Sequence, residues 1–113
     1  ECRINAEDPD NDFRPSPGKI SAFHIPGGPG VRVDTHAYAG YVIPSQYDSL
    51  LAKLIAYGHT REDAVARMLR ALEEFVIEGV PTTIPFHRQA VAHPDFRAGT
   101  ISTDFVQNLN TKR

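Results

Sequence analysis

Cysteine is almost absent from this sequence, which contains one, Cys2, among 113 residues. A single cysteine cannot form a disulfide within the chain, so no disulfide framework is expected. The sequence also begins without a signal peptide, and the two features together predict a protein of the reducing cytoplasm. A reactive thiol is the alternative role for Cys2, because free cysteines serve as nucleophiles where their environment favours the thiolate.

Long apolar runs and basic stripes are also missing. No apolar run approaches the roughly 20 residues that span a bilayer, so we expect a soluble protein without a membrane partner. Twelve Lys and Arg against fourteen Asp and Glu give a net charge of -2. No cluster of basic residues forms a stripe that could neutralise a row of phosphates, which argues against a nucleic-acid partner. The length predicts one domain over residues 1–113.

The first 43 residues predict short strands separated by tight turns, because most of the nine prolines and eight glycines fall there. The strand-like segments are 1–7, 18–24, 30–36 and 40–43. The run 51–57 is ambiguous, since its apolar residues fit either a helix or a strand buried on both faces. We favour the strand.

A long helix is predicted after Thr60, which has the spacing of a capping box with Asp63. Gly79 is its expected end, and Pro81 prevents its resumption. A shorter helix is predicted within 85–93 and a third within 102–109, which gives an α+β domain whose strands precede its helices. Apolar residues recur along the long helix at helical spacing: Val65, Met68, Leu69, Leu72, Phe75 and Val76. Charged pairs four residues apart add support: Asp63 with Arg67, and Arg70 with Glu74.

Metal sites find little support in the spacing of the acidic and histidine residues. Asp8, Asp10 and Asp12 alternate as in a calcium loop, but Phe13 replaces the sixth-position Gly and Lys19 replaces the twelfth-position Glu. We expect a solvated acidic turn. The histidines form no close pair at ligand spacing, although the first two would be neighbours if their strands paired. They are His24, His36, His59, His87 and His93.

Two other catalytic patterns are weak. The segment PGGPGVRVD is rich in glycine, but it leads into a strand-like run and not into the helix that a phosphate loop requires. Ser49 beside Asp48 lacks a G-x-S-x-G context and a histidine at usable spacing, so a small hydrolase is not favoured.

Arg3 and Arg32 are more informative, because each lies in a strand-like segment among short or apolar neighbours. A guanidinium on a rigid strand can direct fixed donors at an oxygen that gains charge during a reaction. The alternative is an ordinary strand arginine that pairs with a nearby carboxylate.

Six segments, in order and over nearly the whole chain, resemble the C-terminal domain of biotin carboxylase. They are ECRINAEDP, F-R-PSPGKI, PGGPGVRVDTHAYAGYVI, YDSLLAKLIAYG, TREDAVARMLRAL and EGVPTT. The resemblance implies an antiparallel, partly rolled β structure of the barrel-sandwich hybrid type, with one long and one or two short helices packed on it. It also implies that 51–57 is a strand.

Enzymes of this family are ligases that use ATP and bicarbonate to carboxylate N1 of biotin on a carrier protein. This is the first half-reaction of acetyl-CoA carboxylase in fatty acid synthesis, and propionyl-CoA and pyruvate carboxylases contain relatives. The resemblance implies that the N-terminal and ATP-grasp domains, which hold ATP with Mg or Mn, lie outside this chain. We therefore expect a fragment that is inactive and binds no cofactor alone. Its expected partners are the upstream ATP-grasp domain, the biotin carboxyl carrier protein and a second copy in a homodimer.

The resemblance also implies roles for particular residues. Arg3 falls on the arginine that contacts the ureido oxygen of biotin, where it would stabilise the charge that develops as N1 loses its proton. Asp48 matches an aspartate expected to pair with Arg3, and a turn or cap aspartate is the alternative. Arg32 matches a homodimer-interface residue, although Pro29 stands where some members have an aromatic residue. Thr103 falls where some members touch the adenine. A non-catalytic module for carrier binding or dimerisation is the alternative function.

Overall fold

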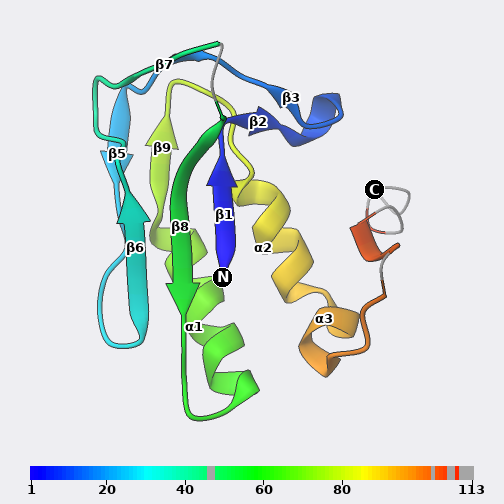
Figure 1. The fold of residues 1–113 in the computed structure, drawn as a ribbon. Coiled ribbons are helices and arrows are strands. Elements are labelled where there is room, and N and C mark those ends of the chain that lie inside the picture. The colour runs from blue at the N-terminus through cyan, green and yellow to red at the C-terminus, as the bar shows by residue number, and fades with distance from the viewer. Residues whose placement is uncertain (46–47, 103, 107–108, 110–113) are drawn as a thin grey trace.

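The computed structural model describes residues 1–45, 48–102, 104–106 and 109. Over these residues the strands outnumber the helices in the first half and the helices follow, as the sequence predicts (Figure 1). The elements are β1 (Cys2–Asn5), β2 (Glu7–Asp8), the 3-10 helix η1 (Pro9–Asn11), β3 (Arg14–Pro15), β4 (Gly18–Lys19), β5 (Ala22–His24), β6 (Val31–Thr35), β7 (Val42–Ile43), β8 (Leu50–Ala56), α1 (Arg61–Glu74), β9 (Val76–Glu78), α2 (Ile84–Ala92) and α3 (Pro94–Ala98).

The largest sheet has three antiparallel strands in the order β1-β8-β6. The helices α1 and α2 lie on one side of it (Figure 1), where α1 packs on β8 and α2 on β1. The described residues also form three two-stranded antiparallel sheets, in the pairs β2-β3, β4-β7 and β5-β9. The α+β class and the antiparallel β structure are confirmed, with small sheets that do not close into a barrel.

The central strand β8 resolves the ambiguous run near residue 51 as a strand, as predicted. Leu51, Ala52 and Leu54 are each about 1 % exposed or less. Ala52 and Leu54 are buried on the face that the helices cover, and Leu51 is buried on the opposite face by the second core cluster, whereas Lys53 on that opposite face is only partly buried. Burial on both faces at this end of β8 explains why the adjacent residues Leu51 and Ala52 are both apolar.

The long helix begins as predicted and ends earlier. The Thr60 hydroxyl accepts a hydrogen bond from the Asp63 backbone N–H at 3.1 Å, one of the two bonds of a capping box. The predicted end at Gly79 is wrong, because α1 stops at Glu74 and Phe75 is its C-cap. The next three residues, Val76–Glu78, form β9 and pair with β5. Their β-branched side chains at Val76 and Ile77 suit a strand better than a helix.

Other local expectations need correction. The strand expected over 18–24 is divided into β4 and β5, which pair with β7 and β9 respectively. The strands of His24 and His36 therefore do not pair, because β6 is bonded to β8. The short helix α3 was not predicted, whereas α2 confirms the helix expected within 85–93. The third helix expected within 102–109 lies partly outside the described residues.

Among the described residues the core consists of three clusters of buried side chains, the smallest of which contains Phe86, Ala90 and Leu109. The first fills the space between the main sheet and the helices, and Ile4, Leu54 and Leu72 are completely buried in it. The second lies under the short strands and contains Ile20, Ile43 and Leu51. None of the helices that the described residues form has the length and apolar character needed to cross a membrane.

Candidate functional site

Arg3 projects from the face of the main sheet that the helices leave open. Its neighbours Cys2 and Ile4 are buried in the sheet–helix cluster, at 7 % and 0 % exposure. Successive strand residues point to opposite faces, so Arg3 is exposed on the other side. The residue opposite it on β8 is Lys53. Among the described residues, no carboxylate pairs with the Arg3 guanidinium.

The backbone of Arg3 is held more firmly than its exposed side chain suggests. Its carbonyl oxygen accepts hydrogen bonds from the Thr83 hydroxyl at 3.1 Å and from His87 Nε2 at 2.8 Å. Because a carbonyl only accepts, Nε2 of His87 carries the proton. Eighty residues or more separate these partners in sequence, so no spacing pattern indicated them. Sequence analysis singled out neither residue as a partner of Arg3.

Asp48 does not form the expected pair with Arg3. In the β1–β8 register, Asn5 lies opposite Leu50 and Arg3 lies opposite Lys53, so Asp48 lies beyond the paired segment. Five residues of extended chain cover on the order of 16 Å, which exceeds the reach of the two side chains. The Asp48 carboxylate instead accepts a hydrogen bond from the Leu50 backbone N–H at 3.0 Å. The alternative role, a cap aspartate before a strand, is the one that the structure shows.

Arg32 forms an ion pair within its own strand. Its Nε and Nη2 atoms donate to the two carboxylate oxygens of Asp34 at 2.9 and 3.0 Å. The hydrogen bond to Asp34 and its charge raise the pKa of Arg32 above its usual value. Both side chains are exposed, at 67 % and 45 %. The alternative of a strand arginine paired with a nearby carboxylate is therefore correct for Arg32, and not for Arg3.

The other candidate side chains take structural roles. Burial raises the pKa of the Cys2 thiol to about 11, which disfavours the thiolate that a nucleophile needs. The Ser49 hydroxyl donates to a Glu7 carboxylate oxygen at 3.2 Å. Asp8 accepts from the Asp10 backbone N–H at 3.0 Å and from Asn11 Nδ2 at 2.6 Å, as an acidic turn residue does. Within the described ranges, no three His, Cys, Asp or Glu side chains gather as metal ligands would.

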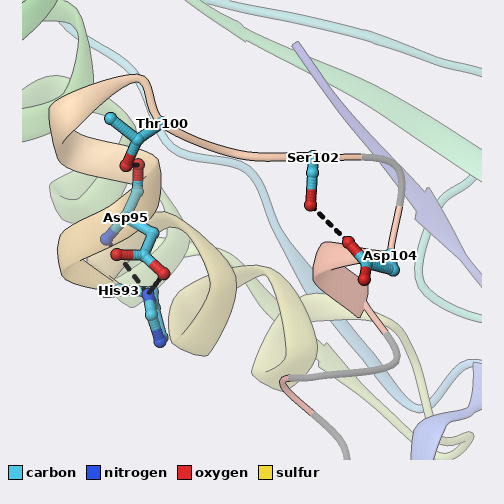
Figure 2. A network of polar contacts seen from close by, with 5 residues as sticks. All are labelled: His93, Asp95, Thr100, Ser102 and Asp104. Atoms are coloured by element: carbon cyan, nitrogen blue, oxygen red, sulfur yellow. Dashed lines mark hydrogen bonds and ion pairs between the residues drawn. The ribbon is translucent and has the colours of Figure 1, made fainter.

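Thr103 lies outside the described residues, so its expected contact with adenine is not placed. Polar side chains on either side of it interact locally, as Figure 2 shows. Ser102 donates to the Asp104 carboxylate. His93 Nδ1 accepts from the Asp95 backbone N–H at 3.1 Å, and the Thr100 hydroxyl donates to the Asp95 carbonyl at 3.3 Å. The bonds of His93 and Thr100 to Asp95 hold the start and end of α3.

Comparison with known proteins gives a consistent result. Residues 1–108 match the protein family described as the biotin carboxylase C-terminal domain. The chain is 58 % identical over 110 residues to biotin carboxylase of Nostoc sp. and to biotin carboxylase 1 of Bacillus subtilis. Each alignment covers 97 % of this chain, and 25 % and 24 % of the two relatives. The chain therefore spans about a quarter of the length of the curated relatives that it matches.

A solved structure matches as well. It is the biotin carboxylase domain of 2-oxoglutarate carboxylase from Hydrogenobacter thermophilus, described as a dimer in complex with MgADP, ADP and bicarbonate. It is 47 % identical in sequence, with a TM-score of 0.93 over 95 % of this chain and 24 % of that one. Both the sequence and the fold are thus similar to one defined portion of larger carboxylases.

Proposed function

The chain belongs to the biotin carboxylase C-terminal domain family, and on that premise we propose that it forms the C-terminal lobe of an ATP-dependent biotin carboxylase. The intact ligase would use ATP, a divalent cation such as Mg and bicarbonate to carboxylate biotin on its carrier protein. The names of the curated relatives and the ADP, Mg and bicarbonate in the similar structure support this activity. The carrier protein and an ATP-grasp domain are its proposed partners, in the cytoplasm and in a pathway such as fatty acid synthesis.

The observation that carries the proposal is that the Arg3 side chain is exposed and forms no ion pair with a described carboxylate. It is exposed on a strand whose backbone is bonded on one edge to β8 and on the other to Thr83 and His87. No carboxylate among the described residues occupies its guanidinium donors. These donors fit the ureido oxygen of biotin, which gains negative charge as N1 is deprotonated. Fixed donors that face such an oxygen lower the barrier because they need no reorganisation during the reaction.

Replacing Arg3 in the intact carboxylase tests this role. Arg3→Ala should lower the turnover of biotin carboxylation by about 10²- to 10³-fold, the usual loss for one oxyanion donor. Binding of ATP and bicarbonate should not change, because those sites are expected in the upstream domains. Arg14→Ala is the matched control, since Arg14 is also an exposed strand arginine. Normal turnover in Arg3→Ala would show that this role is wrong.

The exposed Arg32–Asp34 pair supports a second part of the proposal, that this surface joins two copies of the enzyme. The similar domain from H. thermophilus is described as a dimer. Arg32→Ala would release Asp34 as well as remove the cation, so Arg32→Ala and Asp34→Ala should weaken the dimer alike. Sedimentation of the intact carboxylase at several concentrations measures this, and an unchanged dimer in both variants would exclude the surface.

A further inference from the structure

The outer edge of β1 has no partner strand and is hydrogen-bonded instead to Thr83 at the start of α2. β1 lies at the edge of the main sheet, where the outward N–H and C=O groups of a strand would otherwise be unpaired. Thr83 replaces a partner strand along this edge. Its hydroxyl donates to the Arg3 carbonyl at 3.1 Å and accepts from the Asn5 N–H at 3.0 Å, and its N–H donates to the Asn5 carbonyl at 3.0 Å.

Because its hydroxyl bonds to β1, Thr83 does not cap the helix that it begins. It is the N-cap residue of α2, yet its hydroxyl forms no capping bond to that helix. N-cap threonines normally accept a hydrogen bond from an N–H of the first turn. Here the preceding Thr82 accepts from the Ile84 N–H at 3.3 Å instead, and Pro85 has no N–H to satisfy. The Thr83 hydroxyl is thus released from capping and used on β1.

His87 adds a second bond to the same carbonyl. It lies four residues after Thr83, on the same side of α2, and its N–H bonds to the Thr83 carbonyl at 3.0 Å. Its Nε2 donates to the Arg3 carbonyl at 2.8 Å, so both acceptor sites of that oxygen are used. The helix that carries both residues is itself held, because Arg88 donates to the Leu72 carbonyl of α1 at 3.0 and 3.2 Å.

We propose that Thr83 and His87 are positioning residues that fix the strand at Arg3 and thereby hold its guanidinium where biotin is carboxylated. This inference rests on the proposed function of Arg3. Neither side chain reaches the reacting atoms by this account, and both act through the backbone of Arg3. Misplacing a catalytic group by about 1 Å can cost on the order of 100-fold in rate, so loss of this support should slow the biotin step.

The test uses the intact carboxylase and a pair of His87 variants of similar size. His87→Gln retains an N–H donor near the position of Nε2, whereas His87→Leu fills the space without a donor. We expect His87→Leu to lower biotin carboxylation by about 10- to 100-fold, and His87→Gln to recover most of it. Bicarbonate-dependent ATP hydrolysis, measured without biotin, should be unchanged in both. Thr83→Val is the independent second variant, and Thr83→Ser, which keeps the hydroxyl that bonds to Arg3 and Asn5, is its matched control.

The double variant Arg3→Ala/His87→Leu separates this proposal from the previous one. If His87 acts through Arg3, His87→Leu should have little further effect once Arg3 is alanine. Equal losses in the presence and absence of Arg3, or a parallel loss of ATP hydrolysis, would indicate general damage and overturn the proposal. A large loss in Arg3→Ala with normal rates in His87→Leu and Thr83→Val would overturn it while leaving the role of Arg3 intact. Normal turnover in Arg3→Ala would instead reject the proposed function.

Discussion

His87 should make the stability of this domain dependent on pH. Its burial lowers the pKa of the imidazole, an effect that the hydrogen bond to the Arg3 carbonyl partly opposes. In the unfolded chain a histidine has a pKa of about 6.5. Above that pH the ring is neutral in both states and the folded domain keeps its full stability. Below it the unfolded chain binds a proton that the folded domain resists, so the free energy of unfolding must fall as the pH falls.

The prediction concerns the difference between the wild type and His87→Gln. The wild type should lose stability relative to the variant as the pH falls from about 6.5, and the two curves should run parallel at higher pH. Urea denaturation followed by circular dichroism at several pH values measures this. His24→Gln, at an exposed position on β5, is the control. It should lose stability below about pH 6.5 as the wild type does. A constant difference across the pH range would contradict the assignment.

At the level of single residues, the sequence predicted the environment of Arg32 better than that of Arg3. Side chains two residues apart on a strand point to the same face of the sheet. The residue two positions after Arg32 is the acidic Asp34, whereas the residue two positions after Arg3 is the neutral Asn5. The ion pair of Arg32 was therefore visible in the sequence. The bonds that hold Arg3 come from Thr83 and His87 in a distant helix, and no local pattern reports them.

Among the secondary-structure elements, β9 depends on the glycine that ends it. Gly79 has a φ of +108°, and a Cβ there would collide with the Lys19 carbonyl oxygen and lie 2.9 Å from the Ser21 N atom. The strand is held at this point because the Ser21 N–H donates to the Glu78 carbonyl at 2.8 Å. Only glycine allows the two segments to approach this closely.

Gly79→Ala should therefore destabilise the domain by about 2 kcal/mol or more, through backbone strain and the collision together. Gly40→Ala is the matched control, since Gly40 also has a positive φ, +94°, but no atom lies within 4 Å of its added Cβ. It should cost about 1 kcal/mol, from the backbone alone. Chemical denaturation of both variants measures the two losses. Equal losses would show that the close approach to Lys19 does not matter.

The same region explains why the end of α1 was mispredicted. Phe75 continues the helical spacing of apolar residues, so the sequence alone suggests that the helix goes on. In the structure Phe75 is 2 % exposed at the C-cap, and its backbone N–H still bonds to Ala71. What stops the helix is the pairing of β9 with β5, whose residues lie more than 50 positions earlier. Starts set by a local cap, such as Thr60, were predictable, and ends set by distant pairing were not.

For the whole molecule, the cross-strand pair Phe23 and Ile77 connects the first two of the three core clusters. These residues lie opposite each other on β5 and β9 and pack against both clusters. Phe23 also meets Phe75 edge to face, with ring centroids 6.0 Å apart. The short strands have little buried area of their own, so their stability must come from this connection to the sheet–helix cluster. The α+β class followed from the sequence, but this connection required the observed strand pairing.

The connection predicts one cooperative unfolding transition with two coincident probes. Far-UV circular dichroism reports the helices on the first cluster. Tyrosine fluorescence, which no tryptophan obscures in this chain, reports in part Tyr41 on the second cluster. Phe23→Ala should destabilise the domain by about 2 to 3 kcal/mol and separate the two midpoints, because the short strands would then unfold first. Ile25→Ala, at a nearby apolar position that is 53 % exposed, should change stability by less than about 0.5 kcal/mol. Coincident midpoints in Phe23→Ala would mean that the clusters are joined by other contacts, and separate midpoints in the wild type would mean that they fold independently.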